Sequence, residues 1–330
     1  MATSPVARKA EGEAASSLLG LIVLGVSASA MVTATRARRP GPQNGPSFLV
    51  RSSIRPPASL PAPAGPVAGL RVAAALLGLS VFADSAVEHS RGLYKNPGMY
   101  APVGISALLV SGNVGGLLAR GSDTGVRDSL HATSFMLGIA GVGFHAFNVL
   151  HRPGGLSWHN MFYAAPVGAP AALALAGLIG FAADHVDVGR EGPATLAGLP
   201  AGRVLAGLVA FGLIGTTAEV TLLHFRGNFQ SKYMWLPVTM PPVAAILLAA
   251  SAIRPERSGL PATRAWLGLT AAIGFAGVAF HARGISRMMG GWRNWTQNLA
   301  DGPPLPAPPS FSALALAGLA ALSLMERDND

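Results

Sequence analysis

Hydrophobic residues in this chain gather into long stretches, and the charged residues fall mostly between them. Eight of the stretches are about twenty residues long, which is the length that an α-helix needs to cross a hydrocarbon core of roughly 30 Å. We predict spans near residues 68–88, 100–119, 129–150, 161–183, 203–224, 235–253, 265–285 and 309–325. A soluble protein with eight such helices would lack a water-facing surface. The pattern therefore predicts an all-α polytopic membrane protein.

The predicted spans form two similar sets, because the chain contains an internal repeat. Residues 84–103 match residues 219–238 without a gap, and residues 141–158 align with 277–295. Both halves then contain the run Leu-Ala-Leu-Ala-Gly-Leu, which begins at Leu173 and again at Leu314. Each set has four spans, so both halves have the same orientation in the membrane. We therefore expect two tandem, parallel four-helix repeats.

The repeats are expected to cover residues 67–186 and 200–326, behind an N-terminal region that is not duplicated. Residues 1–34 contain one more apolar stretch, and the Pro- and Arg-rich residues 35–66 are typical of a disordered linker. Ala28-Ser-Ala30 resembles a signal-peptidase site, whereas the length of the apolar run and the arginines after it favour an uncleaved anchor. Both interpretations of the first segment stay open.

Composition narrows the chemistry that this chain can carry. Half of its 330 residues are hydrophobic, 12% are charged, and the formal net charge is +9. In a membrane protein, arginines in loops reflect topology, so no nucleic-acid partner is expected. The chain has no cysteine, which excludes thiolate metal ligands and covalent haem attachment. We find no phosphate-binding loop or dinucleotide-binding fingerprint, and catalysis of the soluble type is not indicated.

Acidic and basic residues repeat near the end of the first span in each half. Asp84 and Glu219 lie within their spans, where an ionised carboxylate costs about 2–3 kcal/mol and needs a partner. Arg91 and Arg226 follow seven residues later, on the same face of a continued helix, and Glu88 lies between the acid and the arginine of the first half. The pattern predicts either a structural ion pair in each half or a ligand or proton site.

Histidines repeat in the same way, at the outgoing ends of the first and third spans. They are His89, His145, His224 and His281. Two imidazoles from different helices at matched depth can ligate a b-type haem axially or, with a nearby carboxylate, a divalent metal. A histidine near a helix end can equally bond to carbonyls, water or a carboxylate without any cofactor.

The third span of the first half carries a further histidine. His131 precedes His145 by fourteen residues, which places the two on nearly the same helix face about 21 Å apart. This spacing resembles the histidine ladder of cytochrome b type proteins, and the resemblance implies that His89 pairs with His145 and His185 with His131. The second half lacks equivalents of His131 and His185. In general plan, though in no sequence motif, tandem four-helix units with paired histidines are similar to haem A synthase.

The sequence thus favours an integral membrane subunit of an electron-transfer system. We expect it to bind haem b or to engage quinone at one membrane face, with a redox enzyme subunit or quinone as its partner, in a bacterial inner membrane. One alternative is a transporter or a proton- or ion-coupled protein with a pseudo-twofold acid–arginine site. Another is a membrane anchor for a partner enzyme, with no site of its own.

Overall fold

The structure is a computed structural model, and it describes most of the chain outside the N-terminal region. The described residues are 65–118, 124–163, 166–188, 193–254 and 259–328. The N-terminal helix predicted at 1–34 and nearly all of the linker predicted at 35–66 lie outside the described residues.

Within the described residues, eight helices are long and apolar enough to cross a membrane. They are α2 (Pro66–Arg91), α3 (Tyr100–Leu118), α4 (Thr124–Leu150), α6 (Gly168–His185), α7 (Ala201–Arg226), α8 (Leu236–Ile253), α9 (Leu260–Ser286) and α11 (Pro309–Asp328). Each coincides with a predicted span, so the prediction of an all-α polytopic membrane protein is confirmed.

Short elements connect the long helices. They are η1 (Pro97–Met99), α5 (Trp158–Tyr163), η2 (Lys232–Trp235), η4 (Gly291–Asn294), α10 (Trp295–Asp301) and the hairpin of β1 (Thr195–Leu196) and β2 (Leu199–Pro200). The predicted start of the fourth span, at residue 161, is wrong, because residues 158–163 form the separate helix α5 and α6 begins only at Gly168. Pro166 lies between the two helices and, like any proline, interrupts a continuous helix.

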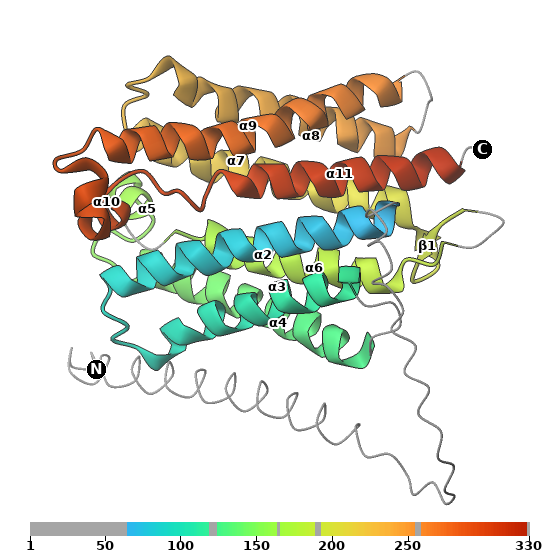
Figure 1. The fold of residues 1–330 in the computed structure, drawn as a ribbon, viewed down its shortest axis with the longest axis horizontal. Helices are drawn as coiled ribbons and strands as arrows, with labels where there is room; N and C mark the ends of the chain where they lie inside the picture. The colour runs from blue at the N-terminus through green and yellow to red at the C-terminus, as the bar shows by residue number, and fades with distance from the viewer. Residues whose placement is uncertain (1–64, 119–123, 164–165, 189–192, 255–258, 329–330) are drawn as a thin grey trace, which may run out of the picture.

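The long helices form two four-helix bundles. Helix α2 packs against α3 and α6, and α4 packs against the same two helices; in the second bundle α7 and α9 each pack against α8 and α11. The bundles meet where α2 contacts α11 and where α6 contacts α7. In Figure 1 the axes of the long helices are roughly aligned, with α2 and α11 side by side at the centre, α5 and α10 at one end and the hairpin at the other.

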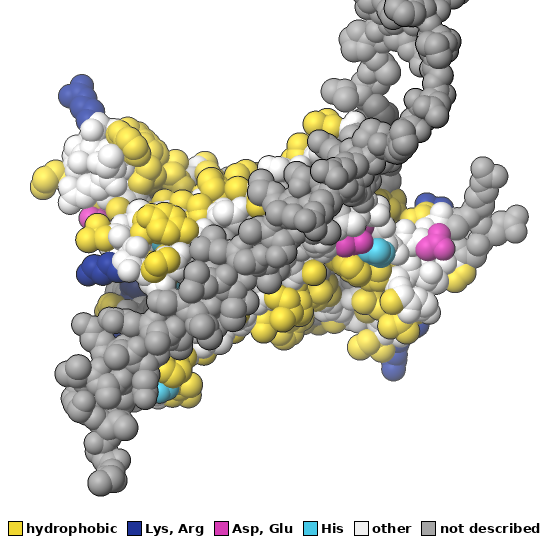
Figure 2. Space-filling model, turned by 90° about the horizontal axis from the view of Figure 1, so that it is seen from below, with side chains coloured by type: hydrophobic (Ala, Val, Ile, Leu, Met, Phe, Trp, Pro, Cys, Tyr) yellow, Lys and Arg dark blue, Asp and Glu magenta, His cyan; other side chains and the backbone are white. Residues whose placement is uncertain are grey.

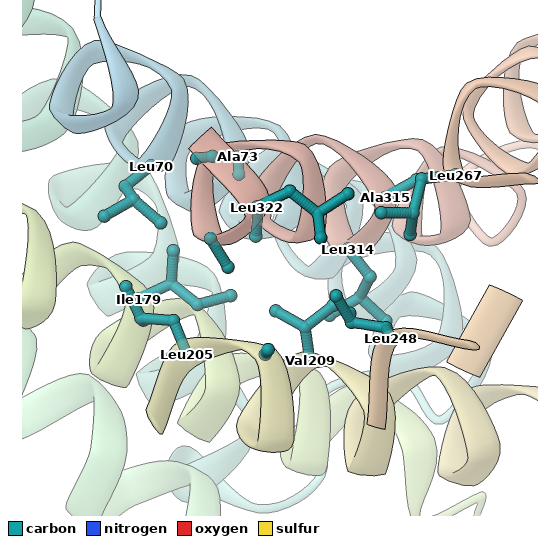
Figure 3. Close-up of a cluster of buried hydrophobic side chains, with 14 of the residues drawn as sticks. Leu70, Ala73, Ile179, Leu205, Val209, Leu248, Leu267, Leu314, Ala315 and Leu322 are labelled. Carbon is teal, nitrogen blue, oxygen red and sulfur yellow. The ribbon is translucent and has the colours of Figure 1, made fainter. Parts of the chain in front are cut away.

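The core between the bundles is made mostly of leucine and alanine side chains (Figure 3). Lipid tails are as apolar as leucine, so close packing rather than removal from water holds such helices together. Glycine allows this closeness: a Cβ on Gly138 would lie 2.7 Å from the carbonyl oxygen of Pro170, and one on Gly274 would lie 2.8 Å from that of Pro308.

The outward surface is also apolar, and Figure 2 shows charged side chains near the two ends of the helices. This surface suits contact with lipid.

The two halves repeat their local geometry in detail. After α2, Leu93 and Tyr94 adopt φ values of 56° and 47°, and after α7, Asn228 and Phe229 adopt 56° and 44°. The Tyr94 ring stacks on Tyr100 at 4.3 Å, as Phe229 stacks on Trp235 at 4.2 Å. These matches support the duplication, while the superposition of whole halves stays a prediction.

The last helices of the two halves, α6 and α11, align in the structure at a different offset from that of their matching Leu-Ala-Leu-Ala-Gly-Leu runs. Gly141 meets the Pro170 ring where Gly277 meets the Pro308 ring, and Gly180 borders His131 where Gly318 borders Leu267. These contacts relate α6 to α11 at an offset of 138 positions, as the pair Pro170 and Pro308 shows. The runs that begin at Leu173 and Leu314 are therefore three residues out of structural register. Low-complexity Leu/Ala sequence cannot fix a helical register, whereas glycine contacts can.

Parallel repeats predict that equivalent loops lie on the same side of the membrane. The chain has no cysteine, so single-cysteine variants need no altered background. We expect Leu93→Cys and Asn228→Cys to react with an impermeant thiol reagent from one side of sealed vesicles, and Leu199→Cys from the other; all three positions are exposed. If positions 93 and 228 react from opposite sides, the halves are inverted and the parallel arrangement is wrong.

Candidate functional site

The four repeated histidines lie at one end of the molecule, which we call the histidine face. Their Nδ1 atoms contact backbone carbonyl oxygens: Met99 at 2.6 Å for His89, Met234 at 2.9 Å for His224, Pro304 at 2.6 Å for His281, and Pro166 for His145. A carbonyl oxygen only accepts hydrogen bonds, so each Nδ1 must carry the hydrogen. In the neutral ring, Nε2 then bears the free lone pair.

Within the described residues, the recorded hydrogen bonds of these four histidines all use Nδ1 and leave Nε2 unengaged. His89 and His145 lie close enough for their charges to interact, and so do His224 and His281. These electrostatic interactions join the same residues that the sequence analysis paired, one pair in each half, and their binding of a shared ligand stays a prediction.

Local sequence explains where the carbonyl acceptors come from. Met99 and Met234 follow the tight turns after α2 and α7, and the methyl carbons of the same methionines lie against the turn glycines Gly92 and Gly227. Two Pro-rich segments, 166–170 and 304–308, supply the other two acceptors. Their carbonyls precede α6 and α11 and are not used inside a helix, so they remain available to the histidines.

The predicted pairing of each acid with the arginine seven residues later is wrong. Arg91 bonds to Glu88 at 3.0 Å, and Arg226 donates to the carbonyl oxygen of Phe162 at 3.0 Å and lies over the Tyr163 ring. Seven residues separate two positions by about 10 Å along a helix axis, which is too far when a partner one turn away or in a neighbouring segment is available. Both arginines are exposed.

Glu219 instead reaches across to the first half. Its carboxylate accepts a hydrogen bond from the backbone N–H of Gly168, at 2.9 Å. Gly168 begins α6, and a carboxylate is favoured at the positive end of a helix dipole. A Cβ at position 168 would overlap the Glu219 carboxylate, so any larger residue requires this carboxylate to leave its present position.

Asp84 lacks the corresponding donor. The segment Pro166-Val-Gly-Ala-Pro170 aligns with Pro304-Leu-Pro-Ala-Pro308, so Pro306 replaces Gly168, and proline has no N–H. Ser80, one turn before Asp84, donates to the carbonyl oxygen of Pro306. No hydrogen bond or ion pair of Asp84 is found among the described residues, and its carboxylate interacts electrostatically with those of Glu88 and Glu219. Equivalent acids of the two halves therefore lie within range of each other.

A second polar cluster lies at the opposite end of the first bundle, and sequence analysis missed most of it. We call it the Asp184 centre; it consists of Arg71, Asn113, Arg127, His131 and Asp184. The Asp184 carboxylate is completely buried and pairs with Arg71 at 2.6 Å and Arg127 at 2.9 Å. These charges lie near helix ends, where sequence alone does not distinguish them from loop charges.

His131 belongs to this centre and not to a histidine pair. Its Nδ1 lies 3.3 Å from an Asp184 oxygen, and the Asn113 amide nitrogen lies 3.2 Å from its Nε2. His185 bonds through Nε2 to Asp128 at 2.8 Å. Both histidines thus have partners other than those that a second rung of a haem ladder requires.

No protein-family model, curated protein or solved structure matches this chain. The function must therefore be inferred from the geometry of the two polar regions.

The contact between Gly168 and Glu219 predicts a steric and electrostatic cost for Gly168→Ala. We expect this variant to lose about 1–3 kcal/mol of stability, measured as a fall in the unfolding temperature in detergent. Gly104→Ala is the control, since its Cβ would meet no atom within 4 Å. In the variant Gly168→Ala/Glu219→Ala the cost should be smaller than the sum of the single costs. Equal stability of Gly168→Ala and Gly104→Ala would contradict the contact.

Proposed function

We propose that this multi-pass membrane protein is a component of an electron-transfer system and holds two b-type haems at the histidine face, one in each half. The observation that carries the proposal is the shared orientation of four histidines. Each directs Nδ1 to a backbone carbonyl and leaves Nε2 free, and they form the pairs His89 with His145 and His224 with His281.

This orientation is typical of metal-ligating histidines, whose second ring nitrogen usually donates to a carbonyl or carboxylate. The hydrogen bond fixes the tautomer and the ring plane before any ligand binds. A haem iron takes two protein ligands, and the neutral imidazoles of His89 and His145 in the first half, and of His224 and His281 in the second, would provide them. A bound haem b would supply reversible one-electron transfer.

The donor set favours haem over a bare divalent metal. Zinc sites in proteins usually have three or four protein ligands. Among the described residues, the group of three or more histidines and acids close enough to share an ion is Asp128, His131 and Asp184, at the other end of the molecule. Glu88, Asp84 and Glu219 do not form such a group with the histidine pairs, so each pair offers two nitrogens and no third ligand.

Exposed side chains at the same face suit a redox partner. Arg91 and Arg226 can balance the carboxylates of a haem or meet an acidic partner surface. Trp158, Tyr163 and Trp295 are exposed nearby on α5 and α10, where amphipathic rings prefer the membrane interface. We propose quinone or a redox enzyme subunit in the bacterial inner membrane as the electron partner.

The haem proposal predicts a reducible visible spectrum for the protein purified from haem-sufficient cells. Because each pair belongs to one half, His145→Ala and His281→Ala should each remove about half of the haem, and the double variant should remove all of it. The measurement is the reduced-minus-oxidised spectrum, with haem quantified as its pyridine complex.

His151→Ala is the matched control, since His151 lies at the end of the same helix but is exposed and stacks on Phe147. Its spectrum should equal that of the wild type. A colourless, correctly inserted protein would eliminate the proposal, and so would equal haem content in the His145→Ala, His281→Ala and His151→Ala variants.

A second candidate function, proton- or ion-coupled transport, is favoured by one observation. Asp84 and Glu219 come from opposite halves and interact across their interface, as a pseudo-twofold coupling site would require. Intramembrane acids of this kind usually serve substrate or proton pathways.

Charge removal separates the two candidates. If transport is the function, Asp84→Asn should stop proton uptake into proteoliposomes, and Glu219→Gln should do the same, because both remove the coupling charge. His145→Ala should leave uptake unchanged. If the protein only transfers electrons, the acid variants keep the wild-type haem content and show no loss of proton flux.

A further inference from the structure

The Asp184 centre is found only in the first half, and the matching positions of the second half carry other residues. The structural offsets relate Arg71, Asn113, Arg127, His131 and Asp184 to Ala206, Leu248, Thr263, Leu267 and Leu322. All five of these residues are buried, and Figure 3 shows Leu248, Leu267 and Leu322 within the hydrophobic core. The duplicated bundle therefore packs at this place without any charged group.

The second half serves as an internal control for the energetics of the first. Buried ion pairs are often replaceable by apolar side chains of similar volume with no loss of stability, because desolvation offsets their attraction. Packing therefore does not explain why the first half keeps two arginines and an aspartate there. The backbone is also adapted to them: a Cβ at Gly116 would lie 2.5 Å from Nη1 of Arg71, and the second half has Ser251 at that position. A charged group kept at such cost within a membrane span indicates function.

A divalent cation does not fit this centre, although Asp128, His131 and Asp184 each offer a ligand atom within 4.8 Å of the others. The Asp184 oxygens already accept from two guanidinium groups. The Asn113 amide donates to Nε2 of His131, so Nδ1 carries the hydrogen and has no lone pair for a metal. A cation would add to two positive charges at contact distance of the same carboxylate.

Protons fit better, because titratable groups lead from the surface to the buried imidazole. Asp128 and His185 form a partly exposed pair, with 32% and 41% of their side chains accessible. His131 is 1% exposed. Three buried polar atoms of the centre have no hydrogen-bond partner: Nη1 of Arg71, Oδ1 of Asn113 and Nδ1 of His131. A centre with unused donors and acceptors can rearrange when a proton arrives.

We propose that the Asp184 centre is a proton-loading site, in which the Asp128–His185 pair passes a proton from water to His131. The pair takes a proton from water at the end of the bundle opposite the histidine face. Asp128 then gives it up and returns to the carboxylate, and His131 becomes an imidazolium through its Nε2 lone pair. Nδ1 keeps its hydrogen and stays near the Asp184 carboxylate, which lies 3.3 Å away and attracts the imidazolium.

Asn113 must respond to this step. A new Nε2–H cannot face the amide nitrogen of Asn113, since both are donors, so the amide turns and its unused Oδ1 accepts the hydrogen. The charged groups that face His131 are Arg71 from α2, Arg127 and Asp128 from α4, and Asp184 from α6. Two arginines balance two aspartates, so the loaded site carries one excess positive charge and holds the proton only until it is passed on or returned.

The test is nitrogen NMR of the full-length protein labelled with ¹⁵N-histidine, which distinguishes neutral imidazole from imidazolium. His131→Leu, the residue that the second half has, assigns the signals. We expect His131 to become charged on acidification. In the variant Asp128→Asn/His185→Ser its exchange with solvent protons should slow by about tenfold or more. Ser129→Ala, on the exposed face next to Asp128, should behave as the wild type.

A second variant separates proton loading from a structural role. It carries Arg71→Ala, Asn113→Leu, Arg127→Thr, His131→Leu and Asp184→Leu, which copies the second half. We expect it to insert and to unfold at a temperature no lower than that of the wild type, without the titrating signal. A failure to fold would show that the centre is structural. A His131 that stays neutral until the protein unfolds, or Zn²⁺ that raises the unfolding temperature of the wild type but not of Asp128→Asn, would also overturn the proposal. None of these outcomes depends on haem.

Discussion

The rest of this structure depends on one constraint, which is that a polar group in the membrane interior must find its partner within the protein. Backbone groups meet it by forming helices, so eight long helices account for most of the described chain. The remaining polar side chains meet it at the two ends of the bundle. Histidines reach carbonyls that lie outside helices, and Glu219 reaches a helix N-terminus. Both candidate sites are places where that requirement is satisfied incompletely.

Sequence alone predicted the parts of the fold that depend on the length of the apolar stretches and on the internal repeat. The spans followed from apolar length, and the histidine pairs followed from equal depth on helices that run the same way. Arg91 and Arg226 were assigned to the wrong partners, because spacing along a helix does not reveal a closer partner such as Glu88 or the carbonyl of Phe162. Long flexible side chains near helix ends choose partners by tertiary proximity.

The Asp184 centre was missed for a related reason. Arg71, Arg127 and Asp184 lie within two turns of helix ends, where charges usually face water or lipid headgroups. Their burial results from packing among α2, α4 and α6, which no local pattern encodes. Comparison of the two halves could have given a signal, since four of the five polar positions become apolar in the second half and the fifth, Arg127, becomes the uncharged Thr263. The register of α11 was needed to see this, and the Leu/Ala run at Leu314 concealed it.

The replacement of Gly168 by Pro306 has a consequence for the symmetry of the molecule. The matched positions of the two halves place an acid, Asp84 or Glu219, beside a Pro-rich backbone segment of the other half. The missing backbone N–H at Pro306 adds to the difference between the two acids: Glu219 is held by the N–H of Gly168, whereas Asp84 has no such donor. The two halves of the chain are therefore not equivalent at this position. They can divide one task between a fixed member and a responsive one, a division that a homodimer of identical subunits cannot encode in its sequence.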